Sequence, residues 1–256
     1  MSPRARISGA IRAAVARGTP AFVAYLTAGF PQRERFRAQL RALGEVADVL
    51  EVGVPFTDPM ADGVTIQRAS LAALAQGVSV AWILAELEAC GELGVPLLLM
   101  SYLNPLLAFG VERLAERAAA AHVAGFIVPD LPLDESSTLR GALAAQQLAL
   151  VQMVTPVTPV ERLTQLCAAS EGFVYAVTMT GTTGKNVAVP DEVLAYLDRV
   201  RSLAPLPVCA GFGIRSPEQV ERLRGHVDGV VIGSALIERL ERGEDPAAWL
   251  RALRPS

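Results

Sequence analysis

Residues 46–63 read VADVLEVGVPFTDPMADG. The first part of this segment, VADVLEV, is an apolar run of strand length that is rich in β-branched residues and stops at Gly53 and Pro55. Glu51 lies inside the run, between Leu50 and Val52, and burying a carboxylate is costly unless it is paired. The segment therefore predicts a buried strand whose C-terminal end carries an acid.

The residues after this strand predict a rigid loop with two more acids. The loop is punctuated by prolines and by Gly63, and it carries Asp58 and Asp62. Acidic groups at a strand end and on the following loop are typical of acid/base sites in barrel enzymes. A purely structural interpretation pairs Glu51 with a buried arginine and makes both aspartates turn residues. We adopt that interpretation for Asp58 alone and predict that Glu51 and Asp62 are catalytic.

Length and composition indicate one domain over residues 1–256. The chain is 52% apolar and 19% charged, with a net charge of -3, which suits one large core. The sequence has no basic cluster of the kind that binds nucleic acid, and no apolar run long enough to span a membrane. Cys90, Cys167 and Cys209 are odd in number and lack metal-ligand spacing. We therefore expect a reduced, cytoplasmic protein.

Lysine and histidine are scarce, which narrows the possible chemistry. The chain has a single lysine, Lys185, against 22 arginines, and its two histidines are His122 and His226. Both histidines precede predicted strands and lie near their N-terminal ends, away from the end of a barrel where catalysis occurs. We therefore expect neither a catalytic histidine nor a metal site.

The N-terminal residues are rich in arginine and amphipathic, a pattern that transit peptides share. However, Ile7, Ile11 and Val15 fall one helical turn apart. This spacing favours an N-terminal helix that covers the domain.

Eight strand-like apolar runs alternate with amphipathic stretches. The expected strands are Phe22–Thr27, Val46–Val52, Pro96–Tyr102, Gly125–Val128, Ala149–Val154, Gly172–Thr178, Pro207–Gly211 and Gly229–Ile232. The expected helices include Arg33–Leu43, Ile83–Ala89, Val111–Ala121, Pro159–Ala169, Pro190–Ser202 and Pro217–Leu223. This alternation predicts a (β/α)₈ TIM barrel of class α/β. A doubly wound open sheet is the alternative, but no G-x-G-x-x-G motif follows the first strand.

Glycine-rich segments follow the last three strands. TGTTG follows the sixth strand, GFG ends the seventh, and Gly233 with Ser234 precedes a predicted helix. Glycines let backbone N–H groups approach an anion, and a helix N-terminus attracts negative charge. These segments together predict a phosphate site, and hence a small phosphate-ester substrate facing Glu51 and Asp62.

Several motifs resemble those of the tryptophan synthase alpha subunit family, and the likeness covers nearly the whole chain. They are LEVGVPFTDPMADG, YLTAGFP, MSYLNP, IVPDLP, FVYAVTMTGTTG, GFGI and DGVVIGSAL, in the family order. The resemblance implies a lyase that cleaves indole-3-glycerol phosphate into indole and glyceraldehyde 3-phosphate. It also implies an αββα complex with a β subunit that holds pyridoxal phosphate, while this chain needs no cofactor.

By position, the resemblance assigns catalysis to Glu51 and Asp62. The substrate-binding residues implied are Tyr175, Thr183, Phe212, Met100, Ile127 and Tyr102, the last of which we expect to orient loops rather than react. The phosphate binders implied are Gly184, Gly213, Gly233 and Ser234. Val64 and Lys185 depart from residues common in the family. A stand-alone lyase that releases free indole, and a non-catalytic partner that regulates a β subunit, remain as alternatives.

Overall fold

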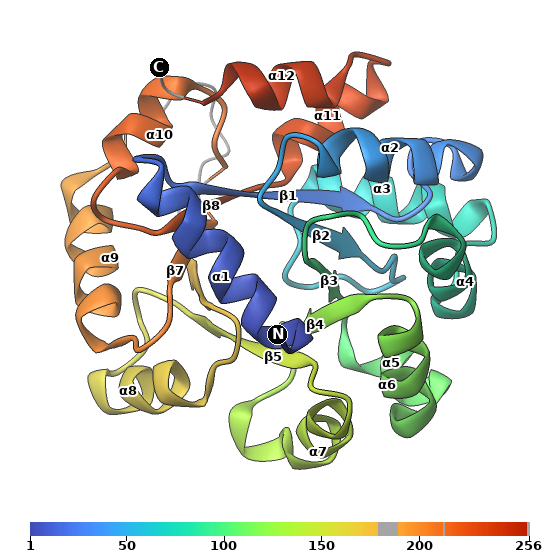
Figure 1. The fold of residues 1–256 in the computed structure, drawn as a ribbon, viewed down its shortest axis with the longest axis horizontal. Coiled ribbons are helices and arrows are strands. Elements are labelled where there is room, and N and C mark those ends of the chain that lie inside the picture. The colour runs from blue at the N-terminus through green and yellow to red at the C-terminus, as the bar shows by residue number, and fades with distance from the viewer. Residues whose placement is uncertain (179–188, 212, 255–256) are drawn as a thin grey trace.

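Eight parallel strands close into a barrel in the order β1 to β8, and helices surround it (Figure 1). The computed structural model describes residues 1–178, 189–211 and 213–254. The strands are β1 Ala21–Thr27, β2 Val49–Gly53, β3 Leu97–Met100, β4 Val123–Ile127, β5 Ala149–Val154, β6 Val174–Val177, β7 Val208–Gly211 and β8 Gly229–Ile232. The predicted (β/α)₈ fold is confirmed.

The outer layer consists of the helices that connect successive strands, together with two helices that follow β8. They are α2 Phe36–Gly44, α3 Val64–Ala75, α4 Val80–Cys90, α5 Leu103–Phe109, α6 Val111–Ala120, α7 Ser137–Ala145, α8 Val160–Ala169, α9 Asp191–Leu203, α10 Pro217–Leu223, α11 Ser234–Glu241 and α12 Pro246–Ala252. Two short 3₁₀ helices, η1 Arg33–Arg35 and η2 Leu133–Glu135, precede α2 and α7. Among the described helices none alone is long and apolar enough to cross a membrane; α3 and α4 pass that test only together, bent by 89°.

The second strand begins three residues later than the sequence suggested. Val46 and Ala47 belong to the turn after α2, and β2 begins at Val49. Asp48 fixes this start because its buried carboxylate accepts a 2.8 Å hydrogen bond from the Phe22 backbone N–H. The predicted third strand was also too long at its C-terminal end, because β3 ends at Met100 and α5 begins at Leu103, three residues later.

Helix α1, Pro3–Ala16, lies across the N-terminal end of the barrel (Figure 1). Ile7, Ile11 and Ala14 are fully buried against side chains that fill the barrel interior. Burying an isoleucine side chain contributes about 1.5–3 kcal/mol, so this contact holds the helix in place. The predicted N-terminal helix is confirmed, but Val15 is 39% exposed and Ala14 takes its place in the contact.

Candidate active site

The C-terminal ends of the strands enclose a cavity of about 210 Å³. It opens at the opposite end of the barrel from α1, where barrel enzymes place their catalytic groups. Its lining residues are Tyr25, Glu51, Ala61, Asp62, Gly63, Ile66, Met100, Met153, Tyr175, Val177, Gly211, Gly213, Val231, Gly233 and Ser234.

Glu51 enters this cavity from the middle of β2. Alternation along the strand turns Leu50 and Val52 toward the helices and Glu51 toward the barrel interior. Glu51 is 1% exposed, and neither carboxylate oxygen has a hydrogen-bond partner among the described residues. Burial, and then the charge of Asp62, raise the pKa of Glu51 to about 8. The alternative interpretation, in which Glu51 pairs with a buried arginine, is therefore wrong. Glu51 carries its proton at neutral pH.

Asp62 reaches the same cavity from the loop between β2 and α3. Burial raises the pKa of Asp62 to about 6, so its carboxylate is mostly ionised at neutral pH. Hydrogen bonds hold its backbone on both sides: the Ala61 N–H donates to the Tyr102 hydroxyl at 2.8 Å, and the Gln67 side chain donates to the Asp62 carbonyl at 2.8 Å. The site thus presents one neutral acid and one ionised acid, an arrangement suited to moving protons in defined directions.

Two tyrosines fill the space around Glu51. Tyr25 pairs with Glu51 across the β1–β2 register, and its hydroxyl lies 3.3 Å from the Thr27 hydroxyl. A Cβ atom at Gly53 would lie 2.6 Å from the Tyr25 ring carbon Cζ, so β2 requires glycine there. Burial raises the pKa of the hydroxyl of Tyr25 and of Tyr175 well above its usual value. Both tyrosines are therefore neutral, and they shape the cavity and exclude water from it.

The other side of the cavity is built to receive an anion. Gly233 is the residue before α11, and Ser234 is the first residue of that helix. Gly213, with φ of 73°, adopts the left-handed backbone conformation that glycine tolerates without strain. The positive end of a helix dipole and nearby backbone N–H groups favour a phosphate at this position.

Comparison with known proteins agrees with this geometry. The family model described as tryptophan synthase alpha chain matches residues 11–253. The chain belongs to the tryptophan synthase alpha chain family. A curated alpha chain from Nitratidesulfovibrio vulgaris is 46% identical over 249 residues, covering 96% of this chain and 97% of that protein. One from Bacillus cereus is 46% identical over 233 residues, with 90% of each chain covered.

Solved structures of tryptophan synthase share the fold of this alpha-chain family member. A structure of Mycobacterium tuberculosis tryptophan synthase has a TM-score of 0.89 at 37% identity, covering 97% of this chain and 96% of that chain. A tryptophan synthase subunit alpha from Legionella pneumophila has a TM-score of 0.87 at 31% identity, with 97% of both chains covered. The likeness therefore extends over the complete barrel.

The structure brings most of the predicted site residues of this alpha chain into one cavity. Those that line it are Glu51, Asp62, Met100, Tyr175, Gly213, Gly233 and Ser234. Ile127 and Tyr102 lie outside the lining, because Ile127 is fully buried inside the barrel and the Tyr102 hydroxyl is bonded to the Ala61 backbone. Three predicted residues, Thr183, Gly184 and Phe212, lie outside the described residues, as does Lys185.

Several lining residues were missed by the sequence analysis. Tyr25 is the most informative, since it shares the inward face of β1 with Val23 and Thr27 and so points into the barrel. The same alternation in β5 places Met153 in the cavity. Within the described part of the chain, no group of three or more His, Cys, Asp or Glu side chains is arranged to hold a metal ion.

Proposed function

We propose that the protein cleaves indole-3-glycerol phosphate into indole and glyceraldehyde 3-phosphate as the alpha subunit of tryptophan synthase. One observation carries this proposal: a buried, unpaired and protonated Glu51 shares a cavity with an ionised Asp62. An anion-binding wall formed by Gly213, Gly233 and Ser234 bounds the same cavity. This combination suits acid/base chemistry on an apolar substrate that carries a phosphate.

In the proposed mechanism, Glu51 first donates its proton to carbon 3 of the indole ring. The ring then becomes a positively charged indoleninium ion, and the adjacent bond to the glycerol chain is weakened. The Glu51 carboxylate next accepts the proton of the neighbouring side-chain hydroxyl. The carbon–carbon bond breaks, its electrons return to the ring to form indole, and the hydroxyl carbon becomes the aldehyde. Glu51 ends the cycle protonated, so a single residue serves both as acid and as base.

Asp62 supports these steps without taking part in bond cleavage. Its carboxylate accepts a hydrogen bond from the ring N–H and stabilises the positive charge that develops there. Phosphate binding at Gly213, Gly233 and Ser234 positions the ring between the two acids, so the binding energy of a remote group contributes to catalysis. This mechanism uses side chains of the chain itself, and we infer that it needs no cofactor of its own.

We further propose that the chain works with a β subunit in an αββα complex, in the cytoplasm. The family membership supports this assembly, in which the β subunit carries the pyridoxal phosphate that joins indole to serine. The exposed apolar side chains of Met60 and Leu107, on the loop after β2 and on α5, lie on elements near the mouth of the barrel. Burial of such side chains would favour association with a partner.

Turnover of the isolated chain, measured with and without an added β subunit, tests the proposal. A low basal rate that the β subunit strongly stimulates would support the role as a subunit. A high rate that the β subunit leaves unchanged would indicate a stand-alone lyase that releases indole. A chain without activity in either assay, but able to change the rate of the β subunit, would be a regulatory partner.

A further inference from the structure

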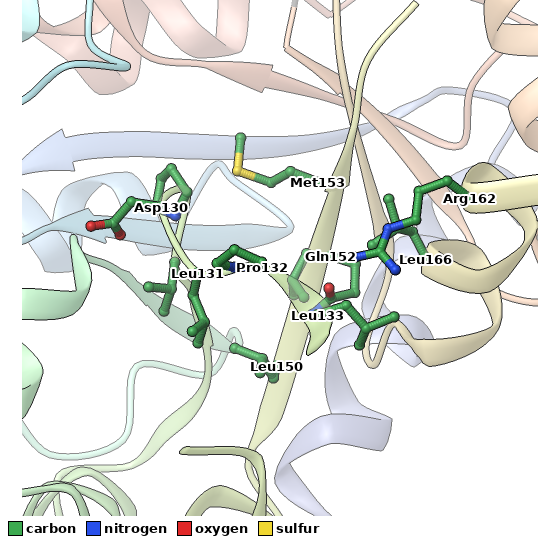
Figure 2. A pocket seen from close by; sticks show the side chains of 12 residues that line it. Asp130, Leu131, Pro132, Leu133, Leu150, Gln152, Met153, Arg162 and Leu166 are labelled. Carbon is green, nitrogen blue, oxygen red and sulfur yellow. The ribbon is translucent and has the colours of Figure 1, made fainter. Parts of the chain in front are cut away.

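A second cavity, of about 300 Å³, lies behind β5 on the side that faces the helices (Figure 2). Its walls come from the segment after β4, from β5 and from α8. The lining residues are Val128, Pro129, Asp130, Leu131, Pro132, Leu133, Leu150, Val151, Gln152, Met153, Arg162 and Leu166. This volume is at the lower end of the range found for small-molecule sites.

The cavity exists because β4 and β5 separate before β5 ends. Their paired residues stop at Ile127 opposite Val151, whereas β5 continues to Val154. After β4 the chain passes through Pro129 and Pro132 into η2, and so leaves β5 uncovered on that side. A rigid proline-containing segment keeps the gap open, since proline restricts the backbone that would have to close it.

Gln152 is the unusual residue of this cavity. In the eight described strands, every residue that faces the helices is apolar except Gln152. The apolar ones belong to one hydrophobic cluster. Gln152 is 6% exposed, and its backbone N–H donates to the Ser170 hydroxyl. Its side-chain amide has no partner among the described residues and is not fully buried, so it is open to the cavity. An amide that faces a cavity without a partner in the protein keeps its donors and acceptor free for a molecule in that cavity.

Figure 2 shows the side chains of Gln152 and Arg162 approaching each other from β5 and α8, with Leu133 beside them. The Gln152 amide offers one acceptor and two donors. The remaining wall is formed largely by leucine, valine and proline side chains. The cavity therefore combines an apolar enclosure with one polar group that can both give and accept a hydrogen bond.

The charges around the cavity disfavour an ionic ligand. Arg162 is paired with Asp134, at 2.6 Å, and also bonds Gln165. The Asp130 carboxylate accepts a 2.9 Å hydrogen bond from the Leu103 backbone N–H, which ties it to the loop after β3. With two carboxylates and one guanidinium nearby, an anion would gain no net attraction and a cation would meet the apolar wall.

We propose that this cavity is a second small-molecule site, which takes a neutral and mainly apolar molecule with an amide group. A cis amide, as in a lactam, presents a donor and an acceptor side by side and can bond the Gln152 amide twice. The ring of the lactam would lie against Leu131, Leu133 and Leu166. Met153 contributes to the walls of both this cavity and the active-site cavity, so the two sites share one residue.

Caprolactam, a seven-membered lactam, is a suitable probe for ligand-observed NMR titration of the whole chain. We expect saturable binding with a Kd on the order of 1 mM, as suits so small a ligand. N-methylcaprolactam has the same ring but lacks the N–H donor, and it should bind about tenfold more weakly or worse. Gln152→Leu keeps the size of the side chain and removes its polar group, so it should weaken caprolactam binding by a similar factor.

The matched control is Gln32→Leu, which changes an exposed glutamine far along the chain from the cavity. It should bind caprolactam as the wild type does. If Gln152→Leu fails to fold, Leu133→Trp is the second variant, because an indole at this partly exposed position would fill the cavity without changing the core. Undiminished binding to the folded Gln152→Leu or Leu133→Trp variant, or no saturable binding to the wild type, would overturn the proposal.

Discussion

The backbone N–H of Ala61 donates a 2.8 Å hydrogen bond to the side-chain oxygen of Tyr102, at the end of β3. This bond ties the residue before Asp62 to a neighbouring strand end, and the Tyr102 ring stacks on Phe56 with centroids 5.2 Å apart. Tyr102 is therefore a positioning residue: it fixes where the catalytic carboxylate can lie without touching the reacting atoms.

Replacing this hydroxyl should slow catalysis while leaving the fold intact. In Tyr102→Phe the ring and its stacking remain, but the Ala61 N–H loses its acceptor. A hydrogen bond of this kind contributes about 1 kcal/mol, so we expect kcat to fall by about five- to tenfold. Tyr196→Phe is the matched control, because the buried Tyr196 hydroxyl has no partner among the described residues. Equal kinetics for the two variants would contradict the positioning role.

Removing the proton of Glu51 should have a much larger effect. Glu51→Gln preserves the shape of the side chain but provides no acid or base. We expect kcat to fall by about 10²–10⁴-fold or more, with little change in the affinity for the phosphate group. Steady-state kinetics together with a phosphate-binding measurement check this. Turnover within tenfold of the wild type would exclude Glu51 as the proton donor.

The same variant should change how stability depends on pH. The pKa of Glu51 rises from 4.5 to about 8 on folding, so between these values the folded state binds more protons than the unfolded state. Stability is therefore lost as pH rises through this window. Melting temperatures of wild type and Glu51→Gln, compared at pH 5 and pH 8.5, should diverge, with the variant increasingly the more stable at high pH. A constant difference between them would show that Glu51 does not titrate in this range.

Activity should follow a bell-shaped pH profile. Catalysis requires an ionised Asp62, whose pKa is about 6, and a protonated Glu51, whose pKa is about 8. We therefore expect kcat/KM to be highest between these values and to fall on both sides. Asp62→Asn should lower the maximum by about 10²–10³-fold and remove the acidic limb while keeping the alkaline one. An unchanged acidic limb in this variant would assign that limb to another group.

The phosphate wall can be tested at Gly233. A Cβ atom there would lie 3.5 Å from the Tyr25 ring, an ordinary contact, so Gly233→Ala should fold. If the backbone approaches phosphate at this point, the methyl group should raise KM by about tenfold or more, the loss of one hydrogen bond to a charged group. Gly213→Ala is a less specific test of phosphate binding, because φ of 73° strains the backbone of any residue other than glycine.

Gly141→Ala, in α7, is the control for this pair: open space surrounds the position, and alanine favours a helix. It should leave KM unchanged. Equal KM values for Gly233→Ala and Gly141→Ala would mean that Gly233 serves only the turn into α11.

The sequence was sufficient to predict the barrel and the position of Glu51, because apolar runs of strand length and the rule for strand ends are local signals. It was not sufficient to identify the cavity wall. Tyr25 and Met153 point inward because of their positions in the alternation of β1 and β5. Which face of a strand is inward is known only when the register between neighbouring strands is known. Ile127 looked equally suitable by position, yet it is fully buried inside the barrel.

Gln152 is a further example of a feature that composition cannot reveal. Within β5 it reads as one polar residue in an apolar run, compatible with either face of the strand. The alternation of β5 places it on the helix-facing side, and its position beside a cavity depends on where the β4–β5 pairing ends. Long-range geometry of this kind is absent from any single stretch of the chain.

Helix α1 has one more consequence. Because Ile7, Ile11 and Ala14 seal one end of the barrel with fully buried contacts, everything that reaches Glu51 must pass through the opposite rim. In the described part of the chain, the incoming substrate and both outgoing products therefore use the same end of the barrel. A partner bound at that rim would control both the entry of substrate and the release of products, including the destination of the released indole.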